Sequence, residues 1–385
     1  MTNKDTKWIS GAKISKAAFY SDYWRKMPLH LSSVLDVKAI STLLTENKLF
    51  ELSQDELVES RLVNNEDFSL EFGPFNSGSL AKNEMLMVQG LESHFETISR
   101  FLSKEFAFLP RWRIDDVMAT YANKDTSCGA HFDYYDVFLI QIRGEKRWQL
   151  DDGLNDEDDI DDKSDVRLLK NFQAKQELIQ KPGDILYIPP KFGHWGIASD
   201  DCLTLSVGMR NPTLQEMLSH LADLVGDQLE ETQTLDDSLE LDYQGIPTST
   251  TQPITQQLVE TLSMSELTSS WFGQYMTELK EPDLIQTPSE HKSLDQLEEI
   301  LWHNDMLQCQ LASRLSYQEG EELTVFINGQ PFVSHSSVLP WFTILLAERE
   351  IKLKLIEKSP ENLTLLAFMF NLGALKEPKL SIVLS

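Results

Sequence analysis

The spacing of apolar positions divides the chain into a helical start, a strand-rich middle and a mixed C-terminal half. Residues 1–60 look mainly helical. Residues 92–108 (ESHFETISRFLSKEFAF) repeat apolar positions three and four apart, which predicts a helix. From about residue 112 to residue 210, short runs rich in Val, Ile, Tyr and Phe alternate with turn signals, which favours an antiparallel sandwich or barrel. The predicted strands are 115–122, 131–143, 146–150, 185–189 and 202–209.

Two turns are predicted within this strand-rich part. Gly144-Glu145 separates Arg143 from Lys146 in the manner of a β-hairpin. Pro182-Gly183-Asp184 has the composition of a tight turn ahead of a strand.

The second half of the chain is predicted to be helical first and mixed afterwards. Residues 213–232 carry apolar residues at helical spacing, which predicts an amphipathic helix. A polar linker (233–256) leads to a second helical segment over about 254–280, and breaks at Pro282 and Pro288 mark a boundary. The remainder mixes helices with strand-like runs, which fits a small winged-helix-like domain. Its predicted elements are helices 293–303 and 338–348 and strands 322–327 and 351–356.

Composition narrows the partners that the protein can have. The 385 residues include 34 Lys and Arg against 61 Asp and Glu, so the net charge is −27. Free nucleic acid is a poor partner for such a chain, because phosphate binding requires clustered cations. Residues 291–385 are also acidic, with 8 Lys and Arg against 12 Asp and Glu, which argues against direct DNA binding. A basic partner fits this charge better.

Other features indicate the cytoplasm. The three cysteines, Cys128, Cys202 and Cys309, are far apart and odd in number, which suggests neither a disulfide framework nor a zinc ribbon. A reducing compartment is expected. The N-terminal residues show no apolar signal core, and no apolar run is long enough for a membrane span.

One segment is acidic enough to need its own interpretation. Residues 151–165 (DDGLNDEDDIDDKSD) cannot form a core strand, so we expect an exposed loop. Two interpretations stay open: a solvated insertion, or a docking surface for a basic substrate.

The strongest chemical signal is a His-x-Asp pair at the start of a predicted strand. On an extended strand, residues i and i+2 point to one face, so His131 and Asp133 aim together. A third ligand is needed, and His194 stands out because it follows a turn, a strand and a Pro-Pro bend. Two histidines and one carboxylate make the facial triad of Fe(II) oxygenases, whereas zinc more often takes a closed tetrahedral set. An isolated His-x-Asp pair with no metal is the alternative.

A 2-oxo acid on the open face of such a metal would need a cation for its distal carboxylate. Lys146 shares a strand face with Trp148 and Leu150, and an inward-pointing lysine is costly unless it is paired. The alternative is that Lys146 turns outward to solvent. Thr204 and Ser206 alternate on one face of the last strand and could add hydroxyl donors, although strand hydroxyls commonly bond to backbone.

Together these motifs resemble a known family, the JmjC/cupin-type ribosomal oxygenases. The match is closest to the bacterial ribosomal-protein arginine hydroxylases. It covers most of the first 212 residues and rests on architecture beyond them. The matching segments are 20-YSDYWRKMPL-29, 59-ESRLV-63, 109-LPRWRIDDVM-118, 131-HFDYYDVFLIQ-141, 144-GEKRW-148, 183-GDILYIPPKFGH-194 and 206-SVGMRNP-212.

The resemblance implies an α+β architecture in three parts. Residues 1–212 would form a JmjC/cupin catalytic domain, a double-stranded β-helix with N-terminal helices. Residues 213–285 would form a helical dimerisation region, and residues 286–385 a winged-helix-like domain. The protein would then be a homodimer.

The resemblance also implies roles for individual residues. His131, Asp133 and His194 match the family's Fe(II) ligands, and Lys146 stands where the family holds the 2-oxoglutarate tail. Tyr134 and Tyr135 lie where the family has residues near the iron and the substrate. The chain departs from the family in two places: 121-YANKDTSCGA-130 replaces a Gly-rich loop, and the arginine hydroxylases often have Arg where Lys146 stands.

The expected function is therefore an Fe(II)- and 2-oxoglutarate-dependent oxygenase that uses O₂. It would hydroxylate a side chain, most simply an arginine, of a basic large-subunit ribosomal protein. Alternatives are the same chemistry on a histidine, a methyl-lysine or a small molecule, and a cupin that only binds a partner.

Overall fold

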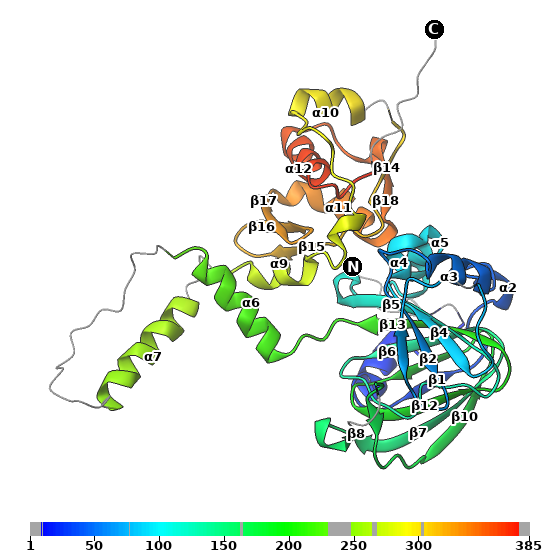
Figure 1. The fold of residues 1–385 in the computed structure, drawn as a ribbon. Coiled ribbons are helices and arrows are strands. Elements are labelled where there is room, and N and C mark those ends of the chain that lie inside the picture. The colour runs from blue at the N-terminus through cyan, green and yellow to red at the C-terminus, as the bar shows by residue number, and fades with distance from the viewer. Residues whose placement is uncertain are drawn as a thin grey trace, which may run out of the picture.

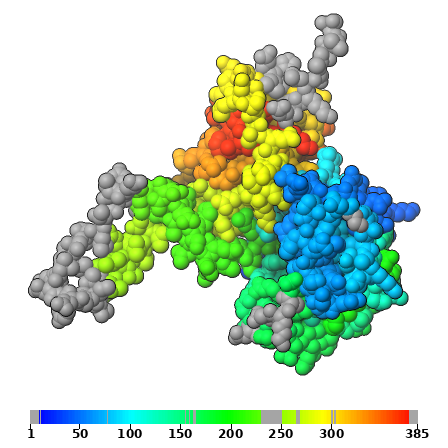
Figure 2. Space-filling model, viewed as in Figure 1, coloured from blue at the N-terminus to red at the C-terminus, as the bar shows by residue number. Residues whose placement is uncertain are grey.

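The computed structural model describes residues 9, 11–76, 78–161, 165–229, 248–263, 268–301 and 304–376. Two parts are stacked on each other, a β-rich N-terminal part and a smaller C-terminal part that is yellow to red in Figure 2. A pair of helices projects to one side between them in the chain (Figure 1). No helix in these ranges has both the length and the apolar character to cross a membrane.

The N-terminal part is built on two antiparallel sheets. Within the described residues the larger sheet has the strand order β1-β11-β6-β13-β5-β4-β2-β3. In that order the strands are Leu29–Leu31, Ile185–Ile188, Val137–Arg143, Cys202–Met209, Ile114–Ala122, Glu84–Val88, Ser60–Asn64 and Leu70–Phe72. The smaller sheet has the order β10-β7-β12, with strands Gln176–Gln180, Lys146–Leu154 and Phe192–Ala198. A short pair, β8 (Ile160–Asp161) and β9 (Leu168–Leu169), lies beside them.

The two sheets pack face to face around a shared interior. Leu139 and Leu186 of the larger sheet join Trp148 and Leu150 of the smaller one in a single buried cluster. A second cluster closes the interior elsewhere and again draws on both sheets. This is the barrel-like arrangement that the strand pattern predicts.

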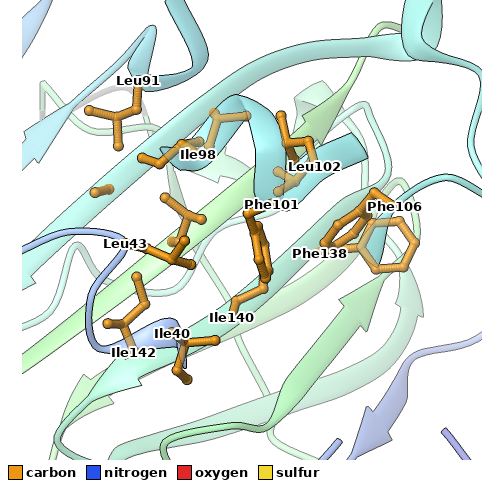
Figure 3. Close-up of a cluster of buried hydrophobic side chains, with 14 of the residues drawn as sticks. Ile40, Leu43, Leu91, Ile98, Phe101, Leu102, Phe106, Phe138, Ile140 and Ile142 are labelled. Atoms are coloured by element: carbon orange, nitrogen blue, oxygen red, sulfur yellow. The ribbon is translucent and has the colours of Figure 1, made fainter. Parts of the chain in front are cut away.

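The outer face of the larger sheet carries the main hydrophobic core. Side chains of β6 alternate between the faces, so that Phe138 and Ile140 point outward. Ile98 and Leu102 of helix α5 pack over them (Figure 3). Because both faces of β6 are buried, its sequence is apolar apart from Gln141 and the terminal Arg143. The helices and turns of this part are α1 (Lys16–Ala18), η1 (Phe19–Tyr23), α2 (Val37–Ile40), α3 (Glu46–Leu52), α4 (Leu91–His94), α5 (Glu96–Glu105), η2 (Arg111–Arg113) and η3 (Glu157–Asp159).

The helical region that follows begins with a complete capping box. Thr213 accepts a hydrogen bond from the backbone of Glu216, whose side chain accepts one from Thr213 in return. Helix α6 (Leu214–Gly226) is followed by α7 (Thr248–Leu262) and α9 (Trp271–Thr277).

The C-terminal part has its own hydrophobic core, formed by helices that pack on small sheets. Its strands are β14 (Met306–Gln308) with β18 (Glu350–Lys352), and β15 (Leu315–Glu319), β16 (Leu323–Ile327) and β17 (Gln330–Ser334) in sequence order. Its helices and turns are η4 (Pro282–Leu284), α10 (Leu294–Leu301), η5 (Ser336–Val338), α11 (Leu339–Glu348), η6 (Leu353–Leu355) and α12 (Pro360–Asn371).

Polar contacts join the C-terminal part to the larger sheet. The Lys280 ammonium lies 2.7 Å from the Asp115 carboxylate. The Arg314 guanidinium donates a hydrogen bond to the Ile114 carbonyl at 3.2 Å. These contacts fix how the smaller part sits beside strand β5.

Four predictions about local structure are wrong. The strand predicted over 131–143 begins only at Val137, because the Asp136 carboxylate is buried against distant partners and holds the preceding residues as a loop. Gly144-Glu145 is no hairpin, because β6 and β7 belong to different sheets. The region 1–60 is less helical than predicted, since Leu29–Leu31 joins the larger sheet at β11. The helix over 92–108 is broken at Phe95, which is extended.

Several elements follow the predictions closely. Strands β5 and β13 and helix α11 match their predicted ranges to within a residue. Gly183 forms the predicted turn before β11 with a φ of +91°. The helix of 213–232 ends early, at Gly226, and the predicted linker lies largely outside the described residues, since α7 already begins at Thr248.

Replacing Phe138 with Ala tests the aromatic centre of this core. The Phe138 ring is fully buried and contacts the rings of Phe19, Phe106, Phe108 and Tyr187. Removing a buried phenyl ring leaves a cavity, so the free energy of unfolding should fall by about 3–5 kcal/mol. Urea denaturation followed by tryptophan fluorescence measures it. The matched control is Phe72→Ala, because Phe72 is 63% exposed; equal losses in the two variants would contradict the assignment.

Candidate metal centre and co-substrate pocket

His131, Asp133 and His194 converge on one point. One ligand atom from each lies within 4.8 Å of the others. The Nε2 atom of His194 is 3.6 Å from Oδ2 of Asp133, and the two imidazole rings are 4.3 Å apart between centroids. His194 is buried, while His131 and Asp133 are half-buried, so the point is open on one side.

Backbone hydrogen bonds set this convergence. The amide of His131 donates to the carbonyl of His194 at 3.0 Å, and the amide of His194 donates back to His131 at 2.8 Å. The two histidines therefore form an isolated antiparallel bridge between the loop that holds His131 and strand β12, to which His194 belongs. The amide of Lys191 donates to the Asp133 carbonyl at 2.7 Å and fixes the third ligand. The predicted ligands are brought together, although the predicted strand is absent at this point.

Hydrogen bonds also fix the loop that runs from His131 to β6 at the end where it enters β6. The Asp136 carboxylate is fully buried and accepts hydrogen bonds from the Tyr187 hydroxyl at 2.5 Å and from Nε of Arg25 at 3.1 Å. The side-chain amide of Asn211 donates to the Tyr134 carbonyl at 2.6 Å. Sequence reasoning missed Asp136, Tyr187 and Arg25, because nothing in their local sequence shows that they meet.

The imidazole rings are oriented as metal ligands require. Nδ1 of His131 lies 3.0 Å from the Gly129 carbonyl, and Nδ1 of His194 lies 3.0 Å from the Phe192 carbonyl. A carbonyl can only accept, so each Nδ1 carries the proton and each Nε2 keeps its lone pair for a metal. The donor set of two imidazoles and one carboxylate fits Fe(II) with an open coordination face.

The pKa values of the two histidines shift in opposite directions. Burial lowers the pKa of His194 to about 4, and the charge of His131 acts in the same direction. Burial also lowers the pKa of His131, but the neighbouring Cys128 sulfur and the Asp133 carboxylate outweigh it and raise the pKa to about 10. Without a metal, these shifts favour a protonated, cationic His131 beside a neutral His194. A divalent cation takes the place of that proton.

Lys146 lies on the inner face of the barrel beside the metal centre. Strand β12 pairs with β7 so that His194 faces Leu150 and Ala198 faces Lys146, which puts His194 and Lys146 on the same face. Lys146 is only 5% exposed, and its ammonium lies 5.0 Å from the centroid of the Trp148 ring. Within the ranges that the structure describes, no carboxylate forms an ion pair with it.

A glycine makes room for this lysine. A Cβ atom at Gly196 would lie 2.9 Å from Cε of Lys146 and 2.6 Å from the Trp148 ring. Any larger residue would push the lysine out of its place. The predicted inward orientation of Lys146 thus holds, and the outward alternative is wrong.

Thr204 and Ser206 also lie on the inner face. They pair with Gln141 and Leu139 of β6, whose side chains point inward. The Thr204 hydroxyl donates to Oε1 of Gln141 at 3.0 Å, so it is already engaged with the protein. Their role toward a co-substrate stays a prediction.

Two tyrosines border the open side of the metal centre. The Tyr134 hydroxyl donates to Glu157 of the acidic segment at 2.8 Å, which ties this segment to the site. The charge of Asp133 raises the pKa of Tyr135, as do burial and the Asp116 carboxylate, so Tyr135 stays a neutral hydrogen-bond donor. Tyr135 remains 41% exposed and can meet a substrate.

Comparison with known proteins gives two matches to protein families. Residues 101–217 match the JmjC domain, and residues 257–376 match the ROXA-like winged helix. The chain is 29% identical over 307 residues to the ribosomal protein uL16 3-hydroxylase of Escherichia coli K12, which covers 75% of this chain and 78% of that protein. The chain belongs to the JmjC-domain ribosomal oxygenase family. This confirms the predicted mixed α+β fold, a JmjC cupin followed by a winged helix.

A second member of the ribosomal oxygenase family, from Haemophilus influenzae, is named a probable ribosomal oxygenase. It is 34% identical over 216 residues, and the alignment spans 54% of this chain but only 53% of that relative.

Solved structures of the Escherichia coli family member YcfD superpose on almost the whole chain. One X-ray structure has 25% identity and a TM-score of 0.81, with 95% of this chain and 98% of that one covered. A complex with cobalt and 2-oxoglutarate has 25% identity, a TM-score of 0.79 and the same coverage. That relative therefore binds a metal and 2-oxoglutarate together on the same fold.

Replacing His131 with Ala tests the metal centre directly. The variant loses one of three ligands, so affinity for Co(II), used as a stand-in for Fe(II), should fall by about 100-fold or more. Isothermal titration calorimetry measures this affinity. His291→Ala is the control, because His291 is exposed and lies in the C-terminal half. Unchanged affinity in His131→Ala would rule out the proposed ligand set.

Proposed function

We propose that this protein is an Fe(II)- and 2-oxoglutarate-dependent oxygenase that hydroxylates an arginine side chain of the large-subunit ribosomal protein uL16. The observation that carries the proposal is the convergence of His131, Asp133 and His194 beside a buried lysine without a carboxylate partner among the described residues. The Escherichia coli relative is named for uL16 3-hydroxylation, which supplies the substrate.

Each site residue has a distinct task. His131, Asp133 and His194 hold Fe(II) on one face, and Lys146 receives the distal carboxylate of 2-oxoglutarate by charge-assisted hydrogen bonds. Thr204 and Ser206 offer hydroxyl groups from the facing sheet. When bound, Fe(II), 2-oxoglutarate and O₂ supply the oxidising chemistry, in which one oxygen atom enters a substrate C–H bond and the other enters succinate as CO₂ leaves.

The open side of the site suits a cationic side chain. The Tyr135 ring lies against Gly208, which pairs with Asp116 on β5. A guanidinium group stacks on aromatic rings and bonds to carboxylates through a planar set of donors. Arginine therefore fits this opening better than an apolar side chain does.

The architecture is proposed to follow the predicted division into 1–212, 213–285 and 286–385. Helices α6 and α7 carry large apolar side chains in contact with solvent, which suits a homodimer interface. The most exposed are Leu214 (82%), Leu218 (57%), Leu258 (61%) and Val259 (52%). A ribosomal-protein substrate supports the proposal that the enzyme acts in the cytoplasm.

Turnover on uL16 tests the function. Purified protein is incubated with Fe(II), 2-oxoglutarate and overlapping peptides that cover uL16. We expect one peptide to gain the mass of one oxygen atom and one succinate to form for each product. Asp133→Ala should abolish both signals, because two imidazoles alone hold Fe(II) poorly. Asp283→Asn, an exposed change of equal charge, should leave them intact.

Other products would redirect the proposal. Formaldehyde in place of a stable gain in mass would indicate demethylation. A gain in mass on histidine would keep the oxygenase but overturn arginine as the target. Absence of succinate with every peptide and with intact uL16 would refute the proposed function.

Changes at Lys146 test the co-substrate pocket. Lys146→Met keeps the length of the side chain but removes the charge, so KM for 2-oxoglutarate should rise by roughly 10- to 100-fold, as for loss of a charged hydrogen bond. Lys146→Arg restores the charge and should lie closer to the unaltered enzyme. Affinity for Co(II) should be similar in all three proteins. An unchanged KM in Lys146→Met would show that the lysine does not hold the co-substrate.

A further inference from the structure

The C-terminal part contains a groove that the oxygenase chemistry does not use. It encloses a cavity of about 680 Å³. Three segments line it: the turn between β15 and β16, the strand β17 with the residues after it, and the first turn of α12. We name it the wing groove.

The charge of the wing groove is uniformly acidic. Among its lining residues are four glutamates, and none is Lys or Arg: Glu319, Glu321, Glu322 and Glu361. Nucleic-acid binding by a winged helix requires clustered cations, so this surface repels phosphate. A basic ligand is attracted to the same surface.

The floor of the wing groove is apolar. Leu323, Phe332 and Leu339 line it, and the Phe332 ring packs on Phe368 at 4.8 Å between centroids. Val333 is 58% exposed at the rim. An acidic rim around an apolar floor fits a peptide that has both basic and apolar side chains, whereas small ions would not need the apolar floor.

One side of the wing groove is an open sheet edge. Strand β17 pairs with β16 over Gln330–Ser334, and no strand of the described residues pairs with its other edge. Apart from Pro331, which has no N–H, such an edge offers unpaired backbone donors and acceptors to an extended peptide, which can add a strand. Its position is visible in Figure 1, where β17 lies on the outer side of the C-terminal part.

We propose that the wing groove docks a basic, extended segment of the ribosomal-protein substrate, away from the residue that is hydroxylated. The choice of this partner rests on the proposed function. The groove and the metal centre belong to separate hydrophobic cores, so one substrate chain would be held at two places. Two linked contacts raise the effective concentration of the target side chain at the site.

Binding of full-length uL16 tests the wing groove apart from catalysis. The full-length enzyme, loaded with Co(II) in place of Fe(II), is titrated with uL16 by isothermal titration calorimetry at low and high salt. Combined Glu319→Gln, Glu321→Gln and Glu322→Gln should weaken binding by about tenfold at low salt and reduce its salt dependence. The matched control combines Glu290→Gln, Glu298→Gln and Glu348→Gln, which are exposed, carry the same charge change and lie outside the groove.

A second variant tests the apolar contact. Val333→Ser leaves the charge unaltered and should weaken uL16 binding by several-fold at both salt concentrations, as expected for loss of an apolar contact. Thermal denaturation checks that each variant is folded. Equal affinity of the groove variants and the control triple would overturn the proposal, and so would absence of uL16 binding to the unaltered enzyme.

Turnover of the short reactive uL16 peptide separates this inference from the proposed function. Such a peptide reaches only the metal centre, so the groove variants should hydroxylate it at the unaltered rate. If no peptide is hydroxylated but uL16 still binds through the groove, the proposed function fails while the docking surface stands. If the groove variants lose peptide turnover while folded, the groove acts on the active site and not as a separate docking surface.

Discussion

The site depends on one mutual contact, the pair of backbone hydrogen bonds between His131 and His194. These residues are 63 positions apart, and their ring positions are coupled because their amides and carbonyls bond directly to each other. The bridge also fixes where the smaller sheet meets the larger one, since His194 continues into β12 while the loop from His131 leads to β6. Two further contacts hold the backbone around Asp133. The amide of Lys191 donates to the Asp133 carbonyl, and the buried Asp136 carboxylate anchors the end of the loop through Tyr187.

The same interior must hold polar groups without losing stability. A buried lysine is tolerated only if its charge is balanced, and the Trp148 ring gives partial compensation through a cation–π contact. The indole of Trp148 in turn donates to Gln180, whose amide bonds to the backbone of β6. The pocket is thus pre-organised for an anion: its lysine is held in place by neighbours that cannot neutralise it.

The sequence predicted the chemistry of the site better than its local geometry. The His-x-Asp pair, the turn, strand and Pro-Pro bend before His194, and the family resemblance together selected His131, Asp133 and His194. Strands β5, β11 and β13 could be predicted because they are rich in apolar residues or clearly bounded by turn residues. The apolar and aromatic content of 131–143 predicts a strand, but residues 132–136 form a loop, because Asp136 is buried in a way that the local sequence does not show. Its burial depends on Arg25 and Tyr187, which only the fold brings to it.

Strands with one exposed face were also not predicted from the sequence. Strand β10 (QELIQ) has mostly polar side chains, and β1 is only three residues long, so neither carries a strong local signal. Both exist because a neighbouring strand offers an unpaired edge, and pairing with that edge outweighs weak local preference. The same preference of an unpaired edge for a partner strand applies to the surface of the C-terminal part. An edge that stays open on β17, beside glutamates and an apolar floor, has the physical properties by which this fold already recruits β1, and a basic extended chain is the partner that its charge selects.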